Sequence, residues 1–126
     1  MIKQVINIKK YWKVIVYYNI DYNLFDIIAD ELKYNKCTDK TIDNIYYNMF
    51  NNAKAFTYSN IEKHISIVGF NKHSDKYDYI NSIVHEAEHI KQHMLKAYNV
   101  DDFGEAPAYT IGYLVMMMLK LNLFCC

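Results

Sequence analysis

The stretch His85-Glu86-Ala87-Glu88-His89 decides how the fold of this chain is interpreted. The residues on both sides of it repeat apolar side chains every three or four positions, which predicts an amphipathic helix. Two histidines four residues apart on a helix lie one turn apart and point the same way. Glu86 is rotated by about 100° from His85, so its carboxylate is expected beside a metal held by the pair rather than on it. The stretch therefore predicts a metal-binding helix.

Two imidazoles at this spacing suit a zinc ion. Their nitrogens can both reach one point about 2.1 Å away. Bound zinc lowers the pKa of its water to about 7, and an acid between the histidines can take a proton from that water. Glu86 is the acid in that position. The alternative is a solvated helix face that happens to be rich in His and Glu.

A zinc site of this kind needs a third protein ligand. His93 continues the four-residue spacing, but eight residues of helix rise about 12 Å, so His85 and His93 cannot share one ion. Glu105 is the favoured candidate, because a chain reversal after the histidine helix would bring it back over the pair. Asp101 and Asp102 compete for the same role, and both also suit helix capping.

The order of these motifs resembles a known family. A strand hairpin, a His-Glu-x-x-His helix and a following helix that opens with Glu-x-x-Ala are similar to the small zincin-type zinc metallopeptidases. In the gluzincin-like members of this class the third ligand is a glutamate, and the motif order resembles that of the ImmA/IrrE type among them. The motif residues are His85-Glu86-Ala87-Glu88-His89 and Glu105-Ala106-Pro107-Ala108-Tyr109-Thr110-Ile111-Gly112. The similarity extends over residues 56–115, roughly half of the chain.

The resemblance implies a set of roles for individual residues. Zinc would be bound by His85, His89 and Glu105, with Glu86 as the general base. The strand that ends near Phe70 would border the cleft, where a peptide substrate could add as an extended strand.

Two positions depart from the pattern that is usual in those relatives. Glu88 stands before the second histidine, where they usually carry Gly, and Tyr109 stands where Asn is usual. Glu88 could at most be a carboxylate partner to an imidazole. Tyr109, four residues after Glu105, is either a donor to a developing oxyanion or an ordinary half-buried tyrosine. Ala108 and Gly112 share the helix face of Glu105, which predicts a close approach to the histidine helix.

Composition limits the classes of protein and partner. A chain of 126 residues, 52% hydrophobic and 22% charged, predicts a single domain over residues 1–126. Lys plus Arg equals Asp plus Glu at 14 each, so no overall basic field exists and no nucleic-acid partner is expected, although local patches are not excluded. The chain start lacks the apolar run of a secretory signal, and Cys37, Cys125 and Cys126 form no spaced disulfide framework, which favours a cytoplasmic location.

Hydrophobic periodicity predicts the remaining elements. We expect a strand over 12–18, helices after Asp21 and after Thr38, strands over 56–58 and 64–70 joined by Ser59-Asn60, the histidine helix, and a fully buried core helix over 108–119. The last segment is shorter than the roughly 20 apolar residues that a membrane span needs, so no membrane span is expected. His64, on a strand, and His73, on a loop, are expected at the surface.

These observations predict an α+β fold of a minimal zincin-like kind. A small, mainly antiparallel sheet would be packed by helices on one side, with the helix of His85 against the helix of Glu105. The expected function is that of a zinc-dependent metallopeptidase, which hydrolyses peptide bonds with a metal-activated water and has a peptide or protein as substrate. The alternative is a zincin-fold protein of weak or no activity that acts as a protein-binding module. Small size and the departures at Glu88 and Tyr109 favour that alternative.

Overall fold

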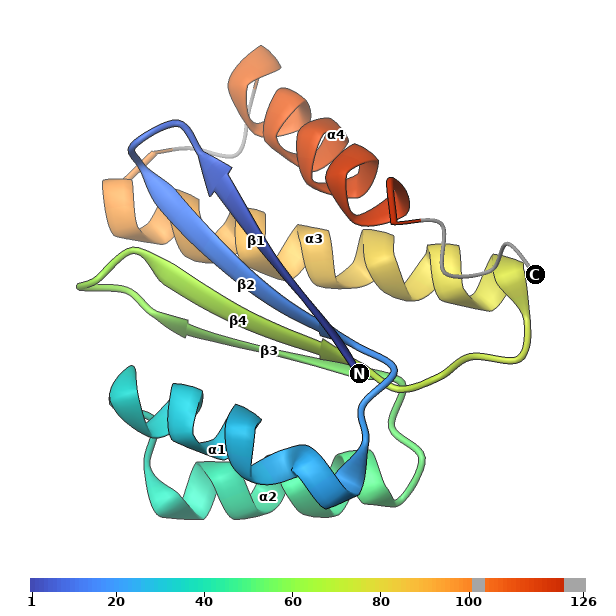
Figure 1. Cartoon of the computed structure of the whole chain (residues 1–126). Helices are drawn as coiled ribbons and strands as arrows, with labels where there is room; N and C mark the ends of the chain where they lie inside the picture. Colours follow the sequence, from blue (N-terminus) through green and yellow to red (C-terminus); the bar gives the residue numbers. More distant parts are fainter. Residues whose placement is uncertain (101–103, 122–126) are drawn as a thin grey trace. The chain divides into compact units, whose positions relative to one another are not determined.

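Residues 1–100 and 104–121, which the computed structural model describes, form four strands, one short 3-10 helix and four α-helices (Figure 1). The elements in chain order are β1 (Ile2–Ile8), β2 (Trp12–Tyr18), η1 (Tyr22–Leu24), α1 (Phe25–Tyr34), α2 (Asp39–Phe50), β3 (Ala55–Asn60), β4 (Ile65–Phe70), α3 (Lys76–Tyr98) and α4 (Glu105–Leu119). They form two compact units that divide between Lys72 and His73. The predicted α+β class is confirmed, while the single domain stays a prediction.

The first unit contains a four-stranded mixed sheet with the order β1-β2-β4-β3. The pairs β1–β2 and β3–β4 are antiparallel, and β2 runs parallel to β4 with Val16 opposite Val68. The sheet is therefore mainly antiparallel, as predicted. However, β4 is paired on both sides, so the strand that ends at Phe70 has no open edge to which a peptide could add. That part of the expectation is wrong, because only the outer strands β1 and β3 of this sheet have an open edge.

Helices α1 and α2 cover one face of this sheet. Their apolar residues, among them Ile28, Leu32 and Ile42, form one buried cluster with Ile15 and Ile67 of the central strands. The alternate residues of β2 are also buried, so β2 is enclosed on both faces. A strand in this position reads as a continuous apolar run rather than an alternating one, which is why 12–18 is so evident in the sequence.

Polar side chains fix where the helices of the first unit begin. Asp21 accepts a hydrogen bond from the Asn23 amide at 3.0 Å and starts the 3-10 turn that leads into α1. Thr38 accepts from the Thr41 amide at 3.2 Å and is the N-cap of α2. Such side chains replace the partners that the first amides of a helix lack. Both helix starts agree with the sequence-based prediction.

The hairpin of β3 and β4 differs from its prediction by several residues. Ser59 and Asn60 belong to β3, and the turn consists of the next four residues, ending at His64. His64 lies in the left-handed region with φ 57° and is half-buried rather than on a strand at the surface. The Asn60 side chain accepts a hydrogen bond from the Lys63 amide at 3.0 Å. This local contact favours a later turn than the polar pair Ser59-Asn60 alone indicates.

The second unit consists of α3 and α4, which pack against each other as predicted. Asp75 caps α3 by accepting from the Tyr77 amide at 2.8 Å, and Asn99 ends it in the left-handed conformation. In α4, Pro107 lies in the first turn, where its missing amide hydrogen costs no helix hydrogen bond.

The prediction that α4 is fully buried is wrong. Leu114 and Met118 are buried, but Tyr109 is 71% exposed and Met116 47% exposed, so α4 buries only one side. An uncharged segment was interpreted as buried all round because apolar composition alone does not show which face is covered. Within the described ranges, none of the helices has both the length and the apolar character that crossing a membrane requires. Asp101, Asp102, Cys125 and Cys126 lie outside the described residues.

Candidate metal centre

His85 and His89 lie on the exposed side of α3 and face each other. Their Nε2 atoms are 3.1 Å apart, the ring centroids are 4.7 Å apart, and the ring planes meet at 81°. Because α3 is an unbroken helix across both residues, the four-residue spacing converts directly into this arrangement. The sequence-based expectation that the two imidazoles point to one place is confirmed.

The nitrogen separation fits two ligands of one metal ion. A tetrahedral zinc ion with bonds of about 2.1 Å holds two nitrogen ligands roughly 3.4 Å apart. The observed 3.1 Å is close to that value. If a hydrogen bond alone joined the rings, one nitrogen would have to carry a proton and the other would not. The pair therefore offers two nitrogen donors that suit zinc, on a surface open to solvent.

Glu86 lies on a different side of the helix from the two histidines. Its side chain is 6% exposed, whereas His85 and His89 are both exposed. One residue advances the helix by about 100°, which separates the carboxylate from the imidazole of His85. Glu86 is therefore a buried carboxylate adjacent to an exposed histidine pair. The role of Glu86 as a base beside the metal therefore stays a prediction.

The Glu88 side chain interacts with residues one turn further along α3. Lys91 Nζ lies 2.9 Å from Glu88 Oε1, and Gln92 Nε2 donates to the same oxygen at 3.1 Å. Lys91 is itself buried, with 7% of its side chain exposed. These contacts show Glu88 paired with Lys91 and Gln92 and give no support to its predicted role as the partner of an imidazole. Sequence reasoning missed Lys91, although its spacing of three residues from Glu88 is that of a helical ion pair.

The second unit contains two further histidines, His93 and His73. His93 lies near His89, and His73 is buried. The ring of His93 is 6.5 Å from that of His89, and burial lowers the pKa of His93, with smaller contributions from the charges of His89 and Lys96. His73 is 8% exposed, and its Nε2 atom lies 2.9 Å from Ser82 Oγ. The expectation that His73 is a surface histidine is wrong, because Ser82 gives it a buried partner that the polar loop sequence does not show.

Glu105 and Tyr109 begin α4. Glu105 is exposed and is the first residue of the helix, directly after Gly104 with φ 89°. Tyr109 is exposed and stacks on Tyr113, with centroids 6.5 Å apart. Gly112 has open space where a side chain would begin, with nothing within 4 Å. The predicted close approach of α3 at Gly112 is therefore wrong.

The structure unites two of the three predicted metal ligands. Among the residues that it describes, no group of three or more His, Cys, Asp or Glu side chains is arranged to hold a metal ion. His85 and His89 are together, and Glu105 is not gathered into one group with them. The three-ligand set consequently stays a prediction.

Comparisons of the chain with models of known protein families, with curated proteins and with solved structures found no match. The similarity to zincin-type metallopeptidases therefore rests on the motif residues alone.

Proposed function

We propose that this protein is a zinc-dependent metallopeptidase with its site on the exposed side of α3. The observation that supports this most directly is the convergence of the His85 and His89 Nε2 atoms to 3.1 Å. Glu86, the residue that follows His85, supplies a buried carboxylate on the same helix. A zinc ion at such a pair polarises a carbonyl oxygen and activates water at neutral pH. A peptide bond is the substrate expected from the zincin-like order of the motifs.

Residues of α3 and α4 would divide the work between them. His85 and His89 would hold the ion through their Nε2 atoms, and each Nδ1–H would then be available to an orienting acceptor. Glu86 would accept a proton from the attacking water and return it to the leaving amine. Tyr109 is proposed as a hydrogen-bond donor to the substrate carbonyl oxygen.

Glu105 is the proposed third ligand. It supplies a carboxylate, which zinc accepts beside two histidines in catalytic sites. Its support is its place as the first, exposed residue of α4, the helix that packs on α3. Glu105→Gln should weaken zinc binding by at least tenfold, as judged by competition with a chromogenic chelator. An unchanged affinity would exclude Glu105 and leave Asp101 and Asp102 as the candidates.

Glu86→Gln is the variant that tests the mechanism. Zinc content, measured by plasma mass spectrometry after mild dialysis, should stay at about one ion per chain. Cleavage of a mixed peptide library should fall by about 10²- to 10⁴-fold, the contribution of a general base. Glu88→Gln is the matched control, since it makes the same change two residues away on the same helix and should retain cleavage.

Three results would contradict the proposal. Cleavage by Glu86→Gln at the original rate would exclude Glu86 as the base. Less than about a tenth of a zinc ion per original chain would remove the metal site. Zinc bound at full stoichiometry, with no peptide in the library cleaved, would favour a zinc-holding protein-binding module instead. The observations that favour this second function are the departures from the zincin pattern at Glu88 and Tyr109.

A further inference from the structure

A second feature that suggests binding lies in the first unit, at the end of the sheet where β2 and β4 begin. Because these strands are parallel, with Lys13 opposite Ile65, the turns that precede them lie at the same end of the sheet (Figure 1). The Lys13 amide also donates to the carbonyl oxygen of His64 at 3.0 Å and joins the two turns directly. Parallel pairing thus brings together residues that are far apart in the sequence.

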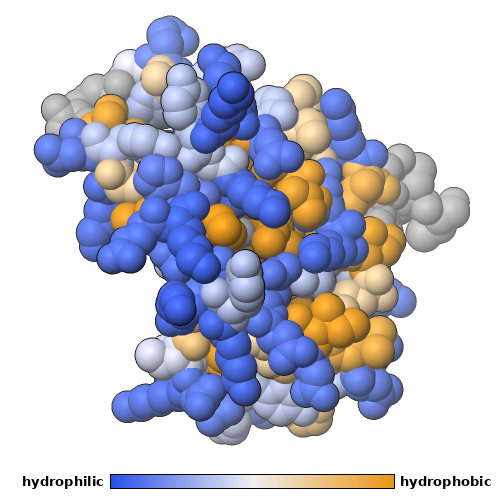
Figure 2. Space-filling model, turned by 60° about the vertical axis from the view of Figure 1, so that its left-hand side comes forward, coloured by the Kyte–Doolittle hydropathy of each residue, from blue (hydrophilic) through white to orange (hydrophobic). Residues whose placement is uncertain are grey.

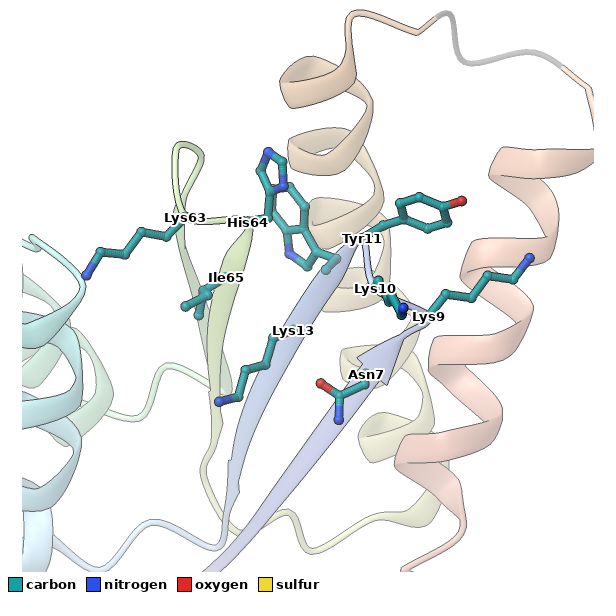
Figure 3. Close-up of a pocket in the computed structure, with 9 residues that line it drawn as sticks. Asn7, Lys9, Lys10, Tyr11, Lys13, Lys63, His64 and Ile65 are labelled. Carbon is teal, nitrogen blue, oxygen red and sulfur yellow. The ribbon is translucent and has the colours of Figure 1, made fainter.

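An open pocket of about 260 Å³ lies at these turns, and its lining includes Lys9, Lys10, Lys13 and Lys63 (Figure 3). Among the described residues that line it there is no carboxylate. Lys9, Lys10 and Lys13 likewise have no ion-pair partner in the described part of the chain. The pocket is a local concentration of positive charge on a chain whose net charge is zero.

Aromatic side chains accompany the lysines. Trp12 is buried, its Nε1 donates to Ser66 Oγ at 2.8 Å, and its ring stacks on His64 with centroids 5.2 Å apart. Tyr11 precedes this stack in the turn and is 55% exposed. Its ring points away from His64 in Figure 3. The Trp12 stack fixes the two turns to each other, and Tyr11 presents an aromatic ring among the lysines.

The lysines are spread around the pocket and do not point at one place. Lys63 and Lys9 extend to opposite sides in Figure 3. Lys63 Nζ lies 4.6 Å from the centre of the Tyr34 ring and donates to the Tyr34 carbonyl oxygen at 3.4 Å. A compact anion such as phosphate requires convergent donors, whereas an extended polyanion meets separate cations along its length. In Figure 2, which brings this end of the sheet forward, hydrophilic residues cover much of the surface between separate apolar patches.

We infer that this pocket binds single-stranded nucleic acid, with the lysines on its phosphates and a base stacked on Tyr11. Sequence-independent single-strand binding combines a positively charged groove with exposed aromatic rings. The two turns provide that combination. An acidic peptide would use the lysines but would have no need of the exposed ring. This inference concerns the first unit alone and does not rest on the proposed metal site.

Fluorescence anisotropy of a labelled oligothymidylate of about twelve nucleotides tests the inference. The full chain is measured in EDTA, so that metal takes no part. We expect a dissociation constant of roughly 1–100 µM. The logarithm of the affinity should fall linearly with the logarithm of the salt concentration. Lys9→Gln/Lys10→Gln/Lys13→Gln should weaken binding by about tenfold or more and lower the salt slope by about 2, since each single-strand phosphate contact contributes about 0.7. Tyr11→Ala should weaken binding by about fivefold or more.

A second triple variant is the control. Lys36→Gln/Lys40→Gln/Lys72→Gln removes the same charge from exposed positions elsewhere in the first unit and should leave the affinity within about twofold. Equal losses in the two triple variants would overturn the inference, as would no binding by the original chain. Tighter binding of duplex DNA, or unchanged binding by Tyr11→Ala, would overturn the single-strand assignment in the same way.

Discussion

The Glu88 carboxylate is held by its own helix rather than by the histidines, and Glu88→Gln tests this reasoning. Lys91 Nζ is 2.9 Å from Glu88 Oε1, and the two side chains are 7% and 39% exposed, respectively. Exposed helical ion pairs contribute about 0.3–0.5 kcal/mol, whereas breaking a buried pair costs about 3–5 kcal/mol. Because only Lys91 is buried, we expect Glu88→Gln to lower the free energy of unfolding by about 1–2 kcal/mol.

Urea-induced unfolding followed by circular dichroism measures this difference. Combining Glu88→Gln with Lys91→Met in a double-mutant cycle should give a coupling energy of about 1 kcal/mol. Zinc affinity, from chelator competition, should stay within about threefold, because the carboxylate faces Lys91 and Gln92. A loss of about 10- to 100-fold, the usual effect of removing an imidazole's orienting partner, would refute the reasoning. So would a stability change below about 0.3 kcal/mol, which would make the pair energetically equivalent to an exposed one.

Two other predictions concern the interior of the protein. Gly69→Ala should lower the free energy of unfolding by about 1–3 kcal/mol in the same urea assay, because the new methyl group would overlap the ring of Phe56. A stability equal to that of the original chain would contradict this packing. The pKa values of Tyr17 and Tyr79 are raised from 10.0 to about 12. Burial is the main cause for both side chains, and the charge of Glu31 adds to it for Tyr17. Since the folded state holds these protons more tightly, the contribution of these two groups to stability should be constant up to about pH 10 and fall between there and about pH 12, and Tyr17→Phe with Tyr79→Phe should flatten that fall.

Elements with their own period could be predicted from the sequence. The helix that carries His85 and His89 and the cap at Thr38 both depend on contacts within a few residues. The buried strand 12–18 was equally evident, because both of its faces are covered. Local chemistry decides each of these features, so a single sequence is enough to find them.

Features that depend on pairing between distant segments could not be predicted in this way. In β1 only Ile6 is buried, so this edge strand lacks the apolar alternation that marks a strand with one covered face. The parallel pairing of β2 with β4 has no local signal at all. This pairing also brings together the turns that hold Lys9, Lys10 and Lys63. Because Lys63 is far from Lys9 and Lys10 in a sequence of balanced charge, the sequence alone does not indicate a basic pocket.

The third metal ligand belongs to the same nonlocal class, which explains why the histidine pair is better defined than the complete site. His85 and His89 share one helix, so a fixed rotation and rise per residue turn their spacing into geometry. A ligand from α4 depends instead on the connection between Asn99, which leaves α3 with φ 53°, and Gly104, which enters α4 with φ 89°. Backbone angles of this kind have no repeating period. The assignment of Glu105 as a ligand therefore rests on the order of the motifs. The zinc affinity of Glu105→Gln is the measurement that tests whether Glu105 belongs to the site.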